Sequence, residues 1–130
     1  MHLERADGRL ISGYGVGVIG IDGREYRTNL LLAHGRVMER WYEGDVAGLE
    51  TTHFAPLLDG PDSELPEICL LGTGAAHRFP PPTLVAALHA RGIALEAMNT
   101  RAACRTYSVL VGEGRAVAAA LFQIAPGSNR

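Results

Sequence analysis

The chain changes its hydrophobic period near its middle, and this change limits the folds open to it. The first half contains short alternating or β-branched segments between glycine turns, whereas the second half alternates short apolar runs with segments of helical spacing. Alternation with period two is typical of half-buried strands, and a period near 3.6 is typical of amphipathic helices. The sequence therefore predicts an antiparallel β part followed by an α/β part.

Three segments of the first half have the pattern of an antiparallel meander. The first segment is β-branched and ends at Asp22-Gly23, a dipeptide that tight hairpin turns prefer. The other two segments alternate apolar and polar side chains, and His34-Gly35 supplies the turn between them, because glycine adopts positive φ without a steric penalty. The predicted strands are residues 16–21, 24–33 and 37–42.

The second half predicts alternating strands and helices. The first helix follows a triple proline, and the second is capped by Asn99 or Thr100. A short helix near 51–58 with a threonine N-cap, and a loop over 59–63, join the two halves. The predicted elements are strands at 68–71, 93–98 and 117–122 and helices at 83–91 and from 99 or 100 to about 111. This order requires at least one parallel crossover, and we expect one domain over residues 1–130 with irregular ends at 1–10 and 126–130.

Residue usage excludes several kinds of chemistry. All 12 basic residues are arginine, so no lysine is present for a Schiff base, a P-loop or a general base. None of the four serines has the glycine neighbours of a nucleophile elbow. The five histidines have neither ligand spacing on one helix face nor a cysteine close by. We therefore expect no metal, no cofactor and no catalytic constellation.

One glycine motif matches a dinucleotide-binding loop only in its letters. Gly15, Gly17 and Gly20 have the spacing of the G-x-G-x-x-G fingerprint. That fingerprint holds a pyrophosphate at the N-terminus of a helix that follows a strand. Here a predicted strand and an Asp-Gly turn follow the glycines, so we expect no dinucleotide site.

The net charge of −2 is unevenly distributed along the chain. Residues 39–67 carry eight acids and one arginine, and residues from 68 onward carry six arginines and two acids. This asymmetry fits either a solvated acidic loop or two faces that meet a partner, and it lacks the basic stripe with aromatic residues that nucleic-acid binding needs. Two cysteines, no secretory signal and no apolar stretch long enough to cross a bilayer predict a soluble, cytoplasmic protein.

Cys104 allows two interpretations. Near a helix N-terminus and beside Arg105, its thiol could have a lowered pKa and be reactive. Its place on the apolar stripe of the predicted helix instead favours a small buried side chain, which is the interpretation we prefer.

A candidate site lies where two predicted strands end. If the strands at 68–71 and 93–98 are parallel neighbours, their C-terminal ends meet at the edge where open α/β sheets bind ligands. Threonine hydroxyls, glycines that let a ligand approach backbone N–H groups, and arginine charges gather there. The candidate ligand-binding residues are Gly72, Thr73, Gly74, Arg78, Asn99, Thr100 and Arg105. Turns and helix caps use the same residue types, so a purely structural role stays open.

Several segments together resemble one known family. They are residues 66–74 (PEICLLGTG), 78–82 (RFPPP), 96–100 (EAMNT) and 102–107 (AACRTY), with Trp41 and the turn at Asp22-Gly23. They are similar to the small domain found in the mitochondrial complex I assembly factor three and in the adipogenesis-associated domain protein. Many bacterial and archaeal members of this family are known only as domains of unknown function.

The resemblance implies a three-layer α/β fold, in which a central mixed sheet has helices on one side and an additional antiparallel β layer from the N-terminal half. It implies no established catalytic activity and, for the mitochondrial branch, a role in assembling a respiratory membrane complex. The chain departs from the family pattern at Asn99, where an acid is common, and at Ser108, where asparagine is common, and the first departure weighs against an enzyme. We therefore expect a non-catalytic binding or assembly domain with a protein partner. The alternatives are a small-molecule or anion-binding domain, an enzyme included, with its site at the C-terminal ends of the strands at 68–71 and 93–98, and a homo-oligomer whose arginine-rich and acid-rich regions meet.

Overall fold

The structure is a computed structural model that describes residues 9–127. Its strands are β1 (Ile11–Gly15), β2 (Val18–Ile21), β3 (Arg24–Tyr26), β4 (Leu30–Ala33), β5 (Arg36–Met38), β6 (Ile68–Gly72), β7 (Ala94–Met98) and β8 (Val117–Leu121). Its helices are α1 (Ala55–Leu58), α2 (Pro82–Ala90) and α3 (Thr100–Gly112), with short 3-10 turns η1 (Val46–Gly48), η2 (Thr51–Phe54) and η3 (Asp62–Glu64).

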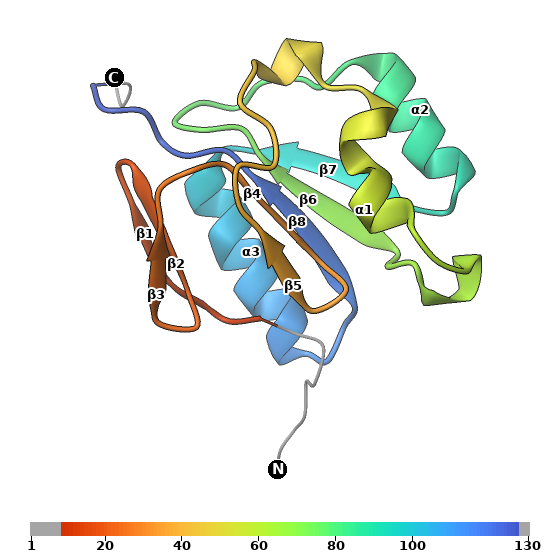
Figure 1. The fold of residues 1–130 in the computed structure, drawn as a ribbon, viewed down its shortest axis with the longest axis horizontal. Helices are drawn as coiled ribbons and strands as arrows, with labels where there is room; N and C mark the ends of the chain where they lie inside the picture. Colours follow the sequence, from red (N-terminus) through yellow and green to blue (C-terminus); the bar gives the residue numbers. More distant parts are fainter. Residues whose placement is uncertain (1–8, 128–130) are drawn as a thin grey trace.

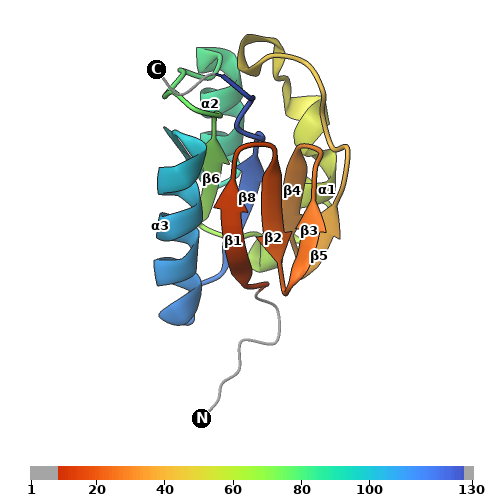
Figure 2. The same cartoon turned by 90° about the vertical axis from the view of Figure 1, so that its left-hand side faces the viewer.

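A five-stranded mixed sheet lies at the centre, with the strand order β5-β4-β8-β6-β7 (Figure 1). Strand β6 is parallel to β7 and β8, whereas β4 is antiparallel to β5 and β8. A separate antiparallel sheet, β1-β2-β3, lies next to α3 and covers one face of the central sheet, as Figure 2 shows. The predicted α/β class, with a central mixed sheet and an additional antiparallel layer, is confirmed.

The helices divide between the two faces of the central sheet instead of lying on one side. Leu84 and Leu88 of α2 pack in one core cluster with Leu71 of β6, whereas Tyr107 of α3 packs in the other cluster with Leu70. The connection β6–α2–β7 runs from β6 toward the β7 edge of the sheet, and the connection β7–α3–β8 runs in the opposite direction, past β6 to β8. Because strand–helix–strand crossovers are right-handed, opposite directions along the sheet place their helices on opposite faces.

The predicted strand at 24–33 is two strands that belong to different sheets. Strand β3 pairs with β2, and β4 pairs with β5 and β8. Between them, Gln123 Nε2 donates to the carbonyls of Tyr26 at 3.0 Å and Thr28 at 2.9 Å, and its backbone N–H donates to Asn29 Oδ1 at 2.8 Å. The side chain of Gln123 thus satisfies backbone carbonyls that have no strand partner where the chain crosses from one sheet to the other. The predicted meander is therefore wrong, and the unpredicted β1 completes the small sheet.

Two further local predictions differ from the structure. The strand expected at 37–42 ends at Met38, because Arg40 has a positive φ of 49° that strand pairing cannot accommodate. The turn before α1 begins after Glu50 instead of a threonine, and the backbone N–H of Glu50 donates to His53 Nδ1 at 2.9 Å in a reciprocal cap.

The second half follows the prediction to within about a residue at most boundaries, with Asn99 as the N-cap of α3. Residues 9–10 and 125–127 form neither helix nor strand, and the rest of the expected irregular ends lies outside the described residues. No helix between residues 9 and 127 is both long enough and apolar enough to span a bilayer.

Gly72 allows α3 to approach the end of β6 closely. A Cβ atom at this position would lie 3.0 Å from Thr100 Cα and 3.1 Å from Ala103 Cβ. These neighbours belong to the buried first turns of α3, so they cannot swing away.

We therefore expect Gly72→Ala to lower the free energy of unfolding by about 1–3 kcal/mol, because it overpacks the contact between α3 and β6. Gly112→Ala is the matched control, since a Cβ atom there meets nothing within 4 Å. Alanine at this helical position should raise stability by about 0.5–1 kcal/mol. Urea unfolding of both variants measures the difference, and equal stability of the two would contradict the packing argument.

Candidate functional site

The predicted meeting of the strand ends occurs in the structure. Strands β6 and β7 pair in parallel, with Gly72 opposite Met98. This register brings the chain after β6 to the start of α3, where the backbone N–H of Thr100 donates to the Gly74 carbonyl at 2.8 Å. The connections after β6 and β7 lead to opposite faces of the sheet, the arrangement at which open α/β sheets bind ligands.

The hydroxyl of Thr100 is used for structure. It accepts a hydrogen bond from the Gly74 N–H at 2.8 Å and donates one to the Phe122 carbonyl at 2.7 Å. Thr100 is completely buried, so its side chain is closed to a ligand. This one hydroxyl instead joins the chain segments that follow β6, β7 and β8.

Thr73 and Asn99 also make internal hydrogen bonds. Thr73 Oγ1 lies 2.7 Å from the Ala76 carbonyl and 3.2 Å from that of Met98, and it accepts from the Arg78 N–H at 3.0 Å. Asn99 Oδ1 accepts from the Ala102 N–H at 2.9 Å, which caps α3. Thr73 therefore fixes the shape of the loop after β6, and Asn99 fixes the start of the helix.

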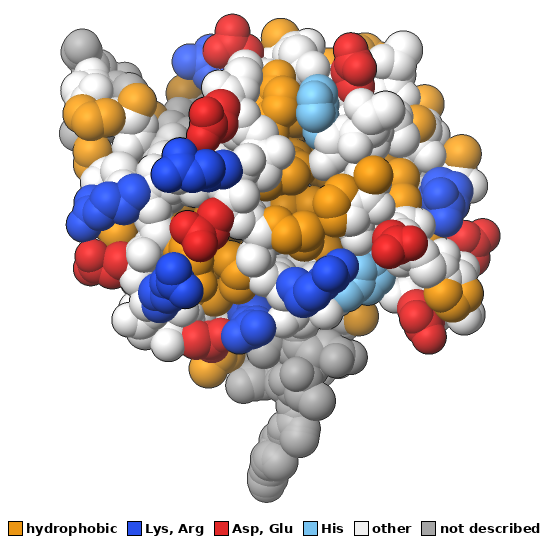
Figure 3. Space-filling view, viewed as in Figure 1, with side chains coloured by type: hydrophobic (Ala, Val, Ile, Leu, Met, Phe, Trp, Pro, Cys, Tyr) orange, Lys and Arg blue, Asp and Glu red, His pale blue; other side chains and the backbone are white. Residues whose placement is uncertain are grey.

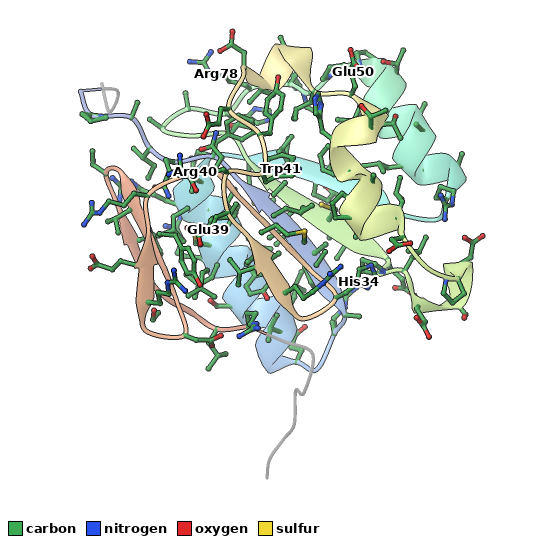
Figure 4. All side chains as sticks on the ribbon, viewed as in Figure 1. His34, Glu39, Arg40, Trp41, Glu50 and Arg78 are labelled. Atoms are coloured by element: carbon green, nitrogen blue, oxygen red, sulfur yellow. The ribbon has the colours of Figure 1, made fainter. Side chains whose placement is uncertain are left out.

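The two arginines of the predicted ligand-binding set, Arg78 and Arg105, lie in different places. Arg105 extends from α3 toward the small sheet, where its Nη1 lies 3.3 Å from the hydroxyl of Tyr14. Arg78 lies on the loop after β6, near the η1 turn, as Figure 4 shows. The predicted set thus splits into a buried structural group, an arginine beside β1 and an arginine beside a groove.

The groove beside Arg78 has a volume of about 580 Å³. It is bounded by the η1 segment, the loop after β6 and the chain after β8, and it includes Asp45, Phe79 and Gln123. The Oε1 atom of Gln123 is buried and has no hydrogen-bond partner among the described residues. The groove therefore combines one cation, one anion and two aromatic side chains, those of Phe79 and Phe122.

Phe79 is the residue that sequence reasoning missed as a site. It is 82% exposed, more than any other large apolar side chain of the described chain, and its ring lies 4.6 Å from that of His77. Phe79 lies between a basic residue and three prolines, outside any strand or helix. An aromatic residue in such a rigid, non-periodic segment is the signal that could have identified it.

Both cysteines are free thiols in the core. Burial raises the pKa of Cys69 to about 12 and that of Cys104 to about 11, although the charge of Arg105 opposes the second shift. A thiol that stays protonated at neutral pH is a poor nucleophile. The structure therefore supports the buried interpretation of Cys104.

The glycine fingerprint lies in a hairpin, as its context predicts. Gly15 ends β1, Gly17 has a positive φ of 72° in the turn, and Gly20 lies in β2. A strand follows the motif where a pyrophosphate site needs a helix. Within residues 9–127, no group of three or more His, Cys, Asp or Glu side chains is arranged to hold a metal ion.

We expect Thr100→Val to lower the free energy of unfolding by about 2–4 kcal/mol, because the isosteric side chain leaves two buried backbone groups without partners. Thr100→Ser keeps the hydroxyl and should recover most of this loss. Chemical denaturation of the two variants measures the difference. If Thr100→Ser destabilises the protein as much as Thr100→Val does, retention of the hydroxyl gives no benefit and the hydrogen-bond argument is contradicted.

The buried thiols also predict how stability depends on pH. Both folded-state pKa values lie above the ordinary 9.0, so the thiols contribute stability that is complete below about pH 9. As pH rises from 9 toward 11, the unfolded chain ionises first and the free energy of unfolding should fall. Denaturation across this range should show a shallower fall for Cys104→Ala than for the unsubstituted chain. Equal slopes would contradict the assignment.

Several known proteins are similar to this chain in sequence or in fold. An uncharacterized protein of Rhodobacter capsulatus is 36% identical over 118 residues, which cover 91% of this chain and 86% of that protein. The protein of Francisella tularensis named the 13 kDa major membrane protein is 31% identical over 96 residues, which cover 72% of this chain and 73% of that protein. The crystal structure of an outer membrane protein from Bartonella henselae has a TM-score of 0.79 at 28% identity, and the match covers 91% of this chain and 98% of the other.

These similarities confirm the expected domain of unknown function, without naming complex I assembly. The family model described as a protein of unknown function (DUF498/DUF598) matches residues 11–122, which include every helix and strand of the described chain. The chain therefore belongs to the DUF498/DUF598 family of proteins of unknown function.

Proposed function

We propose that this chain is a non-catalytic binding and assembly domain, and that it docks a protein partner through the loop after β6. The observation that carries the proposal is the exposure of Phe79, at 82%, on a segment that is itself firmly held. Large apolar side chains contribute most of their binding energy when a partner removes them from water. Aromatic residues and arginine are also the types that dominate protein–protein interfaces, and Arg78 precedes Phe79.

The loop is organised before any partner binds. The Thr73 hydroxyl fixes its first half at Ala76 and Arg78, and the prolines at 80–82 restrict its second half as they lead into α2. A loop held in one shape loses little conformational entropy on binding, so more of the contact energy remains as affinity.

A subunit of a membrane respiratory complex is the partner class that we propose. The support is the resemblance to the assembly-factor branch, together with the name of one similar protein, a major membrane protein. Residues 9–127 contain no helix that could span a bilayer. In this proposal the domain therefore reaches the membrane by docking on a protein embedded there, from the cytoplasmic side.

A second candidate function is the binding of a small anion in the groove beside Arg78. The observation in its favour is the position of Arg78, whose cationic side chain borders the groove. Against it, Asp45 lines the same groove, and the hydroxyls of Thr73 and Thr100 are already used. We rank partner docking first for this reason.

The experiment is gentle purification of the tagged chain from its native host, followed by native mass spectrometry of what travels with it. We expect subunits of a membrane respiratory complex with the unsubstituted chain and a loss of at least about tenfold with Phe79→Ala, which removes a central aromatic anchor. Val109→Ala is the matched control, because Val109 is also exposed, at 59%, but lies on α3. Phe79→Ala without any loss would refute the docking surface. A stoichiometric small mass that disappears in Arg78→Ala would favour the anion-binding function.

A further inference from the structure

Strand β5 leaves one side of its backbone open. It is the outermost strand of the central sheet, and the two-residue turn before it has positive φ at both positions. Such a turn closes on a hydrogen-bonded pair, here Ala33 and Arg36. Hydrogen-bonded and non-hydrogen-bonded pairs alternate along an antiparallel ladder, so the residues of the next pair, Leu32 and Val37, do not bond to each other. The N–H and C=O of Val37 therefore point to the open edge.

A groove of about 720 Å³ runs along this edge, between β5 and the η2–α1 segment. Figure 3 shows apolar surface in the middle of this face, with charged side chains around it. The residues that line the groove are Arg36, Met38, Thr51, Thr52, Ala55, Pro56, Leu58 and Asp59. An open strand edge beside an apolar groove is suited to pairing with another strand.

The charges at the groove restrict what can fill it. Arg36 and Asp59 are both exposed there, and neither belongs to an ion pair of the described chain. An acidic peptide would meet Asp59, and a basic peptide would meet Arg36. The occupant that fits must bring an arginine and an acid at matching positions, and a second copy of this chain carries both.

We propose that β5 pairs antiparallel with β5 of a second copy, about a two-fold axis at Val37. In this register each Val37 exchanges both backbone hydrogen bonds with Val37 of the other copy, and Arg36 lies opposite Met38 of the other copy. The aliphatic part of Arg36 then covers Met38, and its guanidinium enters the groove that Asp59 of the second copy borders. The contact occurs twice, as an isologous interface requires.

Charge reversal tests the pairing between copies. Arg36→Glu alone brings two carboxylates together at each groove, and Asp59→Arg alone brings two guanidinium groups together. We expect each variant to raise the dimer dissociation constant at least about tenfold, measured by sedimentation velocity over a concentration series. An equimolar mixture of the two variants should form heterodimers in native mass spectra, because both interchain pairs are then restored. A mixture that stays monomeric while the unsubstituted chain dimerises would overturn the Arg36–Asp59 pairing.

A backbone variant tests the strand pairing itself. Val37→Pro removes the outward N–H without removing a bond of the β4–β5 ladder, so it should weaken the dimer while the chain stays folded by circular dichroism. Arg27→Glu is the control, since Arg27 pairs with Glu25 on the small sheet, and it should dimerise as the unsubstituted chain does. A chain that is monomeric up to about 1 mM would overturn the proposal. The proposal would also be overturned if the chain stayed monomeric and the NMR signal of the Val37 amide shifted only when an extended peptide was added.

Discussion

Strand β6 must be covered on both of its faces, and the rest of the architecture follows from this requirement. Cys69, Leu70 and Leu71 are fully buried, and parallel strands lie on either side of them. A strand without a polar face needs a layer above and a layer below. Because the β6–α2–β7 and β7–α3–β8 crossovers run in opposite directions along the sheet, each supplies a helix to one face, and α3 alone is too narrow to cover its side. The small sheet β1-β2-β3 completes that layer.

Residues whose role is local were predictable from the sequence, and residues that act across long distances were not. The apolar run of β6 and the cap at Asn99 depend on near neighbours, so period and spacing identified them. The division of 24–33 between two sheets depends on Gln123, whose side chain reaches Tyr26 and Thr28 from more than ninety positions along the chain. Nothing in the alternating pattern at 24–33 indicates that break. Strand β1 was missed because its serine and glycines weaken the strand signal.

The candidate site shows the same distinction. Sequence reasoning correctly brought Thr73 and Thr100 to one sheet edge, since parallel strands end together. It could not decide between a ligand and a structural role, because that depends on where each hydroxyl points. In the structure both hydroxyls bind backbone groups, so the polar residues at the strand ends hold the loop, and the loop presents Phe79. The polar groups that resembled a binding pocket thus support the loop on which the proposed docking surface lies.

The two proposed surfaces lie at separate parts of the molecule. Arg78 marks the docking loop, whereas His34 marks the turn before β5, and Figure 4 shows Arg78 near the top of the molecule and His34 below its middle. Pairing through β5 would therefore leave both Phe79 loops of a dimer free. Two loops on one rigid particle can engage a partner that carries two copies of the target, with a gain in affinity that comes from effective concentration and needs no new contact. A weak apolar contact at each loop would then suffice for assembly, because the second binding event is intramolecular.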